Sequence, residues 1–366
     1  MRKTTVTLGI MSALVMVLIT TAPGFSASNA KLEDRISQLE EKFGAEPRAL
    51  GKISEWVTLS GTIEIEVGFE SSDTDDSDSS DISLATTELG IEAAPKDWLT
   101  GFVLFSWDDD EEKVIVDEAH VTIGASDSIP YYLTAGKLYV PFGAYETMMI
   151  SDPITLDLGE ICDTAVQAGV EINGIRGAVY ASNGDTDEAD DDDTIGIYGL
   201  SMGYAMENDN FSLDVGADWI NSILESDALN EMVTNTGDLK DYVAGVAVHV
   251  MAGFGPVCII GEYVEALDDI EFIGGASREG MSAWALEAGY TLELSGFETT
   301  FALGYQESED AVGILPESKI LGSVGVAFND YLSLACEYAL AEDYNVADGR
   351  SDEDTDTVTL QLAFEF

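Results

Sequence analysis

Two short runs in this sequence match the patterns of catalytic motifs. Asp117-Glu118-Ala119-His120 has the letters of a helicase box, and Gly199-Leu200-Ser201-Met202-Gly203 has the spacing of a serine nucleophile elbow. Nucleoside triphosphate hydrolysis also needs a phosphate-binding G-x-x-x-x-G-K-[ST] loop, which the sequence lacks. A nucleophile elbow needs a strand that turns into a helix, whereas this serine lies in a run of β-type alternation. We therefore expect no catalytic residue in either run.

Side chains that could bind a metal or form disulfides are few. The two histidines, His120 and His249, are isolated, so they support neither a metal site nor a catalytic triad. The three cysteines are an odd number at wide spacing, which fits neither a disulfide framework nor a zinc signature. We expect an enzyme activity, a resident metal and a cofactor all to be absent.

The charge of the chain is unusual for a sequence so rich in apolar residues. Its 366 residues include 70 Asp and Glu against 15 Lys and Arg, a formal net charge of −55, yet 46% are hydrophobic. Binding to nucleic acid is excluded because it needs a basic face. A disordered acidic chain would be poor in apolar and aromatic residues. A folded arrangement must therefore separate the carboxylates from the apolar side chains.

The N-terminus has the pattern of a secretory signal peptide, which predicts export. A basic start at Arg2 and Lys3 precedes an apolar run at 8–19 and the small residues of 28–30, so we assign 1–30 to the signal peptide. Residues 31–54 are predicted to form a short coiled-coil helix and linker on the periplasmic side. This helix is either an oligomerisation seam or a plain amphipathic helix.

From residue 55 to residue 366 the apolar pattern has the period of two that is typical of β-strands. The connections alternate between short turns, among them the hairpin signal Asn173-Gly174, and longer loops. Strands of about 9–11 residues cross a bilayer when tilted. The fold class is therefore predicted to be all-β, a 16-stranded antiparallel transmembrane β-barrel of the outer membrane of a Gram-negative cell. The predicted strands are 55–70, 82–93, 99–107, 114–124, 131–141, 165–173, 175–182, 195–205, 211–219, 242–252, 256–266, 282–292, 297–306, 319–328, 331–340 and 357–366.

The two phases of these strands differ in chemistry. Apolar residues occupy one phase and would face lipid, whereas acidic residues occupy the other and would face a water-filled lumen. All five tryptophans fall near strand ends, as in an interfacial girdle. A soluble β-sandwich is disfavoured because it would not combine an export signal, an acidic inner phase and a terminal Phe. The predicted lumen-facing acids are Glu64, Glu66, Glu88, Glu92, Glu118, Glu171, Asp214, Asp218, Glu287, Glu337 and Glu365.

Other charged residues leave alternatives open. The acidic runs in loops 71–81, 183–194 and 341–356 are either solvated or bridge divalent cations at the cell surface. Three basic residues lie within strands: Lys137, Arg176 and Lys319. Arg176 is predicted to face the lumen, and the phase of Lys137 is ambiguous. Such cations would either create a transverse field at a constriction or neutralise nearby carboxylates.

Several segments resemble a known family of outer-membrane proteins. Residues 134–143 are similar to the G-K/R…P-F-G stretch of substrate-selective porins. Residues 150–160 restrict this similarity to a smaller group of these proteins. Together with 81–90, 117–119, 262–264 and 360–366, they resemble the LbtU-type siderophore porin family. This resemblance implies a barrel without a plug domain that admits ferric siderophores. It also implies that loop 142–164 folds into the lumen and that Phe366 is an assembly signal.

We therefore predict an outer-membrane porin for small solutes such as ferric siderophores. The alternatives are a general cation-preferring porin and a structural surface barrel that binds divalent cations. Expected partners are membrane lipid and the solute, with a homotrimer left open and nucleic acid excluded. The predicted pore-lining or constriction residues are Lys137, Arg176, Glu146, Asp152, Asp157, Glu160, Glu118 and Glu171.

Overall fold

The structure is a computed structural model of the whole chain. The segments predicted as signal peptide (1–30) and coiled-coil helix (31–54) lie outside the residues that it describes. The same is true of parts of the acidic runs in loops 71–81, 183–194 and 341–356. The described residues are 56–72, 78–108, 113–126, 129–186, 188, 195–208, 210–236, 239–346, 350 and 353–366.

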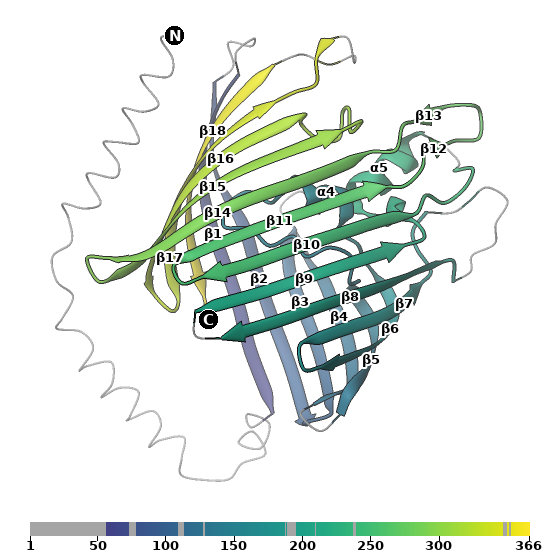
Figure 1. The fold of residues 1–366 in the computed structure, drawn as a ribbon, viewed down its shortest axis with the longest axis horizontal. Coiled ribbons are helices and arrows are strands. Elements are labelled where there is room, and N and C mark those ends of the chain that lie inside the picture. Colours follow the sequence, from purple (N-terminus) through teal and green to yellow (C-terminus); the bar gives the residue numbers. More distant parts are fainter. Residues whose placement is uncertain are drawn as a thin grey trace. The chain divides into compact units, whose positions relative to one another are not determined.

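Sixteen strands form one closed antiparallel barrel, in which each strand pairs with its neighbours along the chain and β1 pairs with β18 (Figure 1). The predicted number of strands and their order are confirmed. The strands are β1 (Val57–Ser72), β2 (Ser79–Lys96), β3 (Leu99–Asp108), β4 (Lys113–Ser126), β5 (Ile129–Tyr139), β6 (Cys162–Ile172), β7 (Ile175–Ser182), β8 (Ile197–Asn208), β9 (Phe211–Ile220), β10 (Gly245–Phe254), β11 (Val257–Ala266), β14 (Ser282–Leu294), β15 (Phe297–Glu309), β16 (Ser318–Asn329), β17 (Leu332–Glu342) and β18 (Asp354–Glu365).

The outer face of the barrel is apolar. Alternate residues such as Val179 on β7 and Leu303 on β15 are 58% and 72% exposed, although they are large and aliphatic. Aromatic pairs mark both ends of the strands: Tyr198–Trp219 near the long loops and Phe211–Phe254 near the short turns. An apolar band between two aromatic belts is the surface that a bilayer covers. The barrel is thus a protein of the outer membrane.

The hairpin between β6 and β7 follows the sequence signal at Asn173-Gly174. Both residues have positive φ, +52° and +81°, as a two-residue type I′ turn requires. A Cβ on Gly174 would lie 2.0 Å from the carbonyl oxygen of Ala205 on the next strand. Glycine is needed here for its backbone conformation and for the close approach of β8.

The long loops carry structure that the period-two pattern did not predict. The β5–β6 loop contains α4 (Ile154–Gly159), and the β9–β10 loop contains η1 (Ile223–Glu225) and α5 (Asp227–Thr236). A two-stranded sheet of β12 (Ile270–Glu271) and β13 (Ser277–Arg278) lies in the β11–β14 loop. No helix in the described part of the chain is long and apolar enough to span a membrane.

These loops pack a hydrophobic core against part of the inner wall. Leu138 on β5, Tyr180 on β7 and Val264 on β11 are buried together with loop residues. The loop members include Phe142, Ile154, Leu158, Ile223, Leu224, Leu229 and Leu239. The long-loop end of the lumen is therefore filled along one side of the barrel.

The Gly174→Ala substitution tests the hairpin geometry. The new methyl group meets the Ala205 carbonyl, and alanine disfavours positive φ, so we expect a loss of about 1–3 kcal/mol in the free energy of unfolding. Gly255 is the matched control, because its φ is +58° and a Cβ added there would have no atom within 4 Å. Urea unfolding in detergent or lipid should show a larger loss for Gly174→Ala than for Gly255→Ala. Equal losses would contradict the close approach of β8.

Candidate functional site: the inward loop and the facing wall

The β5–β6 loop, residues 140–161, lies against the inner wall of the barrel, as the family resemblance implied. Three buried glutamates of the wall accept hydrogen bonds from successive polar groups of the loop. Glu262 on β11 accepts from the N–H groups of Ala144 and Tyr145, at 2.6 and 3.1 Å. Glu287 on β14 accepts from the Met148 N–H and the Thr147 hydroxyl, both at 2.7 Å.

The third glutamate continues this series on a more distant strand. Glu337 on β17 accepts from the Ile150 N–H at 2.6 Å and from the Ser151 hydroxyl at 2.7 Å. Between β14 and β17, the Ser323 hydroxyl of β16 donates to the Met148 carbonyl at 2.9 Å. Loop donors at 144/145, 147/148 and 150/151 thus meet successive parts of the wall, and the loop crosses the strands.

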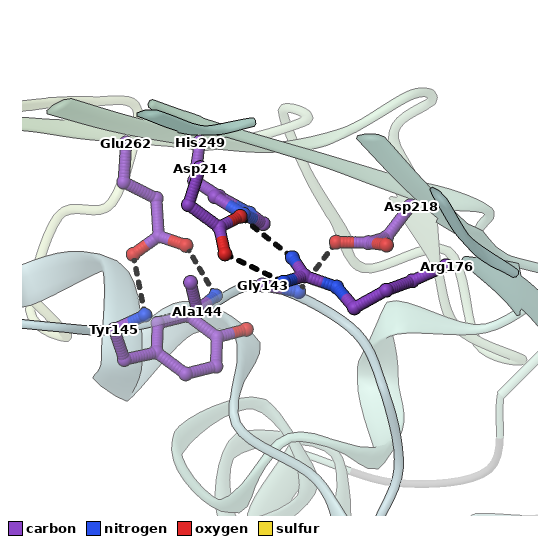
Figure 2. A network of polar contacts seen from close by, with 8 residues as sticks. All are labelled: Gly143, Ala144, Tyr145, Arg176, Asp214, Asp218, His249 and Glu262. Atoms are coloured by element: carbon purple, nitrogen blue, oxygen red, sulfur yellow. Dashed lines mark hydrogen bonds and ion pairs between the residues drawn. The ribbon is translucent and has the colours of Figure 1, made fainter. Parts of the chain in front are cut away.

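The root of the loop is a tight bend held by the same type of contact (Figure 2). The Gly143 N–H donates to Asp218 on β9 at 3.0 Å. Tyr145 has a φ of +55°, and its hydroxyl donates to the Phe142 carbonyl at 2.6 Å. A left-handed tyrosine is unfavourable by itself, so the surrounding hydrogen bonds must maintain this bend.

Four wall carboxylates that accept hydrogen bonds from the loop are buried, so they do not line an open pore. Asp218, Glu262, Glu287 and Glu337 are 5%, 8%, 1% and 2% exposed. Three of them were predicted to face the lumen, and they do face inward, but the loop covers them. Glu262 was missed as an inward acid because the apolar residues of 256–266 occupy both phases.

The loop itself presents other acids to solvent. Glu146, Asp152 and Asp157 are exposed, and Glu160 is half-buried where the loop returns to β6. Partial desolvation by the surrounding protein raises the pKa of Asp152, whereas Lys319 on β16 lowers it and Glu64 on β1 raises it. Partial desolvation also raises the pKa of Asp157, against the effect of Lys319. Asp152 therefore lies within electrostatic range of both β16 and β1.

The wall that the loop contacts do not cover also carries inward acids. Glu64 and Glu66 lie two residues apart on the inward phase of β1, and Glu66 accepts a 2.9 Å bond from Gln361 on β18. Glu118 on β4 is inward beside His120, with 3.7 Å between its Oε2 and the histidine Nε2. Glu171 on β6 is exposed, on the inward phase, and pairs in register with Arg176.

The three basic residues that were predicted to lie within strands have three different positions. Lys137 alternates with buried Leu138 and shares the phase of exposed Tyr131 and Leu133, so it faces outward, and its Nζ donates to the Val116 carbonyl at 3.1 Å. The prediction that Lys137 lines the pore is therefore wrong. The sequence left this phase ambiguous because both phases of 131–141 are apolar.

Arg176 faces the lumen, as predicted, but a carboxylate neutralises it. Its guanidinium forms two bonds to Asp214 on β9, at 2.5 and 2.6 Å, and His249 on β10 lies 3.2 Å from the same carboxylate (Figure 2). Paired, two-point contacts of this kind are among the stronger ion pairs. Lys319 faces the lumen on β16, and its Nζ lies 3.4 Å from the Ser151 hydroxyl.

Both runs that match the patterns of catalytic motifs lie within barrel strands. Residues 117–120 lie in β4 and residues 199–203 in β8, and no helix follows the latter run directly. Within the described residues, no group of three or more His, Cys, Asp or Glu side chains is placed to hold a metal ion. All three cysteines, Cys162, Cys258 and Cys336, are free.

The closed sixteen-stranded barrel and its inward loop define a porin-type barrel of the outer membrane. Solved structures share this fold at low identity. The outer-membrane channel DcaP of Acinetobacter baumannii has a TM-score of 0.58 at 15% identity, covering 85% of this chain and 97% of that one. The anion-selective porin of Comamonas acidovorans has a TM-score of 0.60 at 11% identity, covering 85% and 99%. The trimer form of OmpT from Vibrio cholerae has a TM-score of 0.54 at 14% identity, covering 85% and 99%.

Some proteins of other bacteria have a higher sequence identity to this chain than these solved structures have. A UPF0422 protein of Coxiella burnetii is 27% identical over 303 residues, which cover 78% of this chain and 64% of the relative. A UPF0422 protein of Legionella pneumophila (strain Philadelphia 1) is 25% identical over 322 residues, covering 79% and 60%. The chain thus spans less than two thirds of the length of these relatives. No protein-family model matches the chain.

Replacing Glu337 tests whether the wall carboxylates position the loop. Glu337→Ala leaves the Ile150 and Ser151 donors without their acceptor, which costs about 1–3 kcal/mol for each buried group left unpaired. We expect faster protease cleavage within 140–161 in the folded protein. Glu337→Gln keeps an acceptor oxygen and should have a smaller effect.

Glu64→Ala is the matched control, since it removes the same charge from the inner wall without a hydrogen bond to the loop. Its loop should be cleaved at the rate of the unmodified protein. If Glu337→Ala behaved like Glu64→Ala, the wall carboxylates would not be what holds the loop.

Proposed function

We propose that this protein is an outer-membrane diffusion channel that prefers cations. The observation that carries the proposal is that acidic side chains face inward from both the loop and the barrel wall. Asp152 and Asp157 are exposed on the loop, and Glu64 and Glu66 face inward from β1. A low-dielectric wall lined by one sign of charge concentrates counter-ions in the passage.

The basic groups offset only part of this lining. On the inward phase of the described strands, Arg176 is bonded to Asp214, so its charge is already compensated. Lys319 faces at least two loop carboxylates. A sixteen-stranded barrel is wide enough for an aqueous passage even with part of its interior occupied by loops. The proposal is therefore a channel and not an enzyme.

A narrower proposal is the uptake of ferric siderophores, which rests on the sequence resemblance. The acidic lining limits which ferric siderophores could pass. An anionic ferric complex would be repelled, whereas a neutral or cationic one would not. We also propose contact with membrane lipid through the apolar outer face. Assembly into a trimer, as in the OmpT trimer form, and binding of divalent cations by the acidic outer loops are further proposals.

Planar-bilayer recordings of the purified protein test the channel. We expect discrete conductance steps and, under a KCl gradient, a reversal potential of the sign given by potassium preference. Asp152→Asn with Asp157→Asn should reduce the preference, because two lining charges are lost. A ferric siderophore that enters the channel should interrupt the current.

Each alternative has its own result in the same recordings. A complete lack of conductance steps would overturn the channel and favour a structural barrel. Anion preference would overturn the role given to the acidic lining. Currents unaffected by neutral, cationic and anionic ferric siderophores would contradict the siderophore proposal and leave the general channel.

The pH dependence of selectivity tests Glu160. Burial, reinforced by Asp227, Asp152, Asp117 and Asp157, raises the pKa of Glu160 to about 7. Because its carboxyl gains a proton as the pH falls through this value, potassium preference should fall between about pH 8 and about pH 6. Glu160→Gln should remove this step while the preference at the alkaline end decreases slightly. A step of unchanged size in Glu160→Gln would assign it to another group.

A further inference from the structure

Lys319 differs in its surroundings from Lys137 and Arg176. Lys137 faces outward, and Arg176 is bonded to Asp214. Lys319 is on the inward phase of β16, where its partners across the sheet are Gln306 and Ala341. Among the described residues, no carboxylate oxygen lies within 4.0 Å of its ammonium. It is therefore an inward cation without a direct ion pair.

The loop is fixed next to this ammonium. Ser151, whose hydroxyl lies 3.4 Å from the Lys319 Nζ, is itself bonded through that hydroxyl to Glu337 at 2.7 Å. Further along β16, the Ser323 hydroxyl binds the Met148 carbonyl. Strand β16 and loop residues 148–151 thus form one hydrogen-bonded unit, which holds Lys319 at the edge of the loop.

The loop carboxylates on which this ammonium acts are Asp152 and Asp157, and both are exposed. Glu64 acts on Asp152 from β1, which is separated from β16 by β17 and β18. One positive group and several negative groups therefore face the lumen from β16, from β1 and from the loop. A field across the passage orients a solute that carries both signs of charge.

We propose that Lys319 is a specificity-determining residue of the channel, which makes the constriction bipolar and favours zwitterionic solutes that carry an ammonium and a carboxylate group. The ammonium of Lys319 attracts the solute carboxylate, while Asp152, Asp157 and Glu64 attract its ammonium. Lys319 also weakens the attraction of the loop for simple cations. This inference rests on the proposed channel function.

Two measurements on Lys319→Gln test the inference. In planar bilayers, loss of the ammonium should raise the potassium-to-chloride permeability ratio by roughly twofold, the effect of one unit charge across several ångströms of water. In liposome swelling, the rate for glycylglycine relative to that for arabinose, an uncharged solute, should fall. Lys319→Arg keeps the charge and should preserve both ratios.

Lys96→Gln is the matched control, because it removes an exposed lysine at the short-turn end of β2 and should leave both ratios unchanged. If Lys319→Gln forms channels with unaltered ratios, the role of Lys319 is overturned while the channel remains. If only the ion ratio changes, the zwitterion preference is overturned. If the unmodified protein forms no channel at all, the proposed function itself fails.

Discussion

The arrangement of the lumen depends on one interaction: buried wall carboxylates accept hydrogen bonds from the backbone of the inward loop. Glu262, Glu287 and Glu337 each bind two or more loop donors, and Asp218 binds the Gly143 N–H at the root. Charge-assisted bonds of this type are stronger than neutral ones, and leaving such a carboxylate unpaired would be costly. The loop therefore follows the positions of these acids.

This anchoring divides the lumen into two sides. Where the loop runs, inward residues of β5, β7 and β11 are buried in a hydrophobic core with the loop helices. On the side of β1 and β4, inward acids such as Glu64, Glu66 and Glu118 remain accessible in part. The loop acids Glu146, Asp152 and Asp157 are exposed as well. Burial thus distinguishes two groups of inward carboxylates: the covered ones hold the loop, and the accessible ones are those that we propose to act on solutes.

The barrel could be predicted because lipid and water impose a period of two on every strand. The phases of 55–70 and 357–366 are correct in detail, and the short turns occur where the turn residues predict them. Prediction is weaker where both phases are apolar. The inward neighbours of Lys137 are apolar because they pack against the loop, so the phase of 131–141 is ambiguous in the sequence and the pore position predicted for Lys137 is wrong. Glu262 escapes prediction for the same reason.

Strand number, the apolar outer face and the separation of carboxylates from lipid follow from the sequence alone, because these features are local and repeat along the chain. The family resemblance, also read from the sequence, leads to the prediction that the loop acids Glu146, Asp152, Asp157 and Glu160 lie at the pore. The folded barrel is needed to show which carboxylates accept hydrogen bonds from the loop and that the inward Lys319 lacks a direct ion pair. Those outcomes depend on contacts such as Ile150 with Glu337, which are 187 residues apart. No local pattern encodes such a distant pairing, since it exists only when the barrel closes.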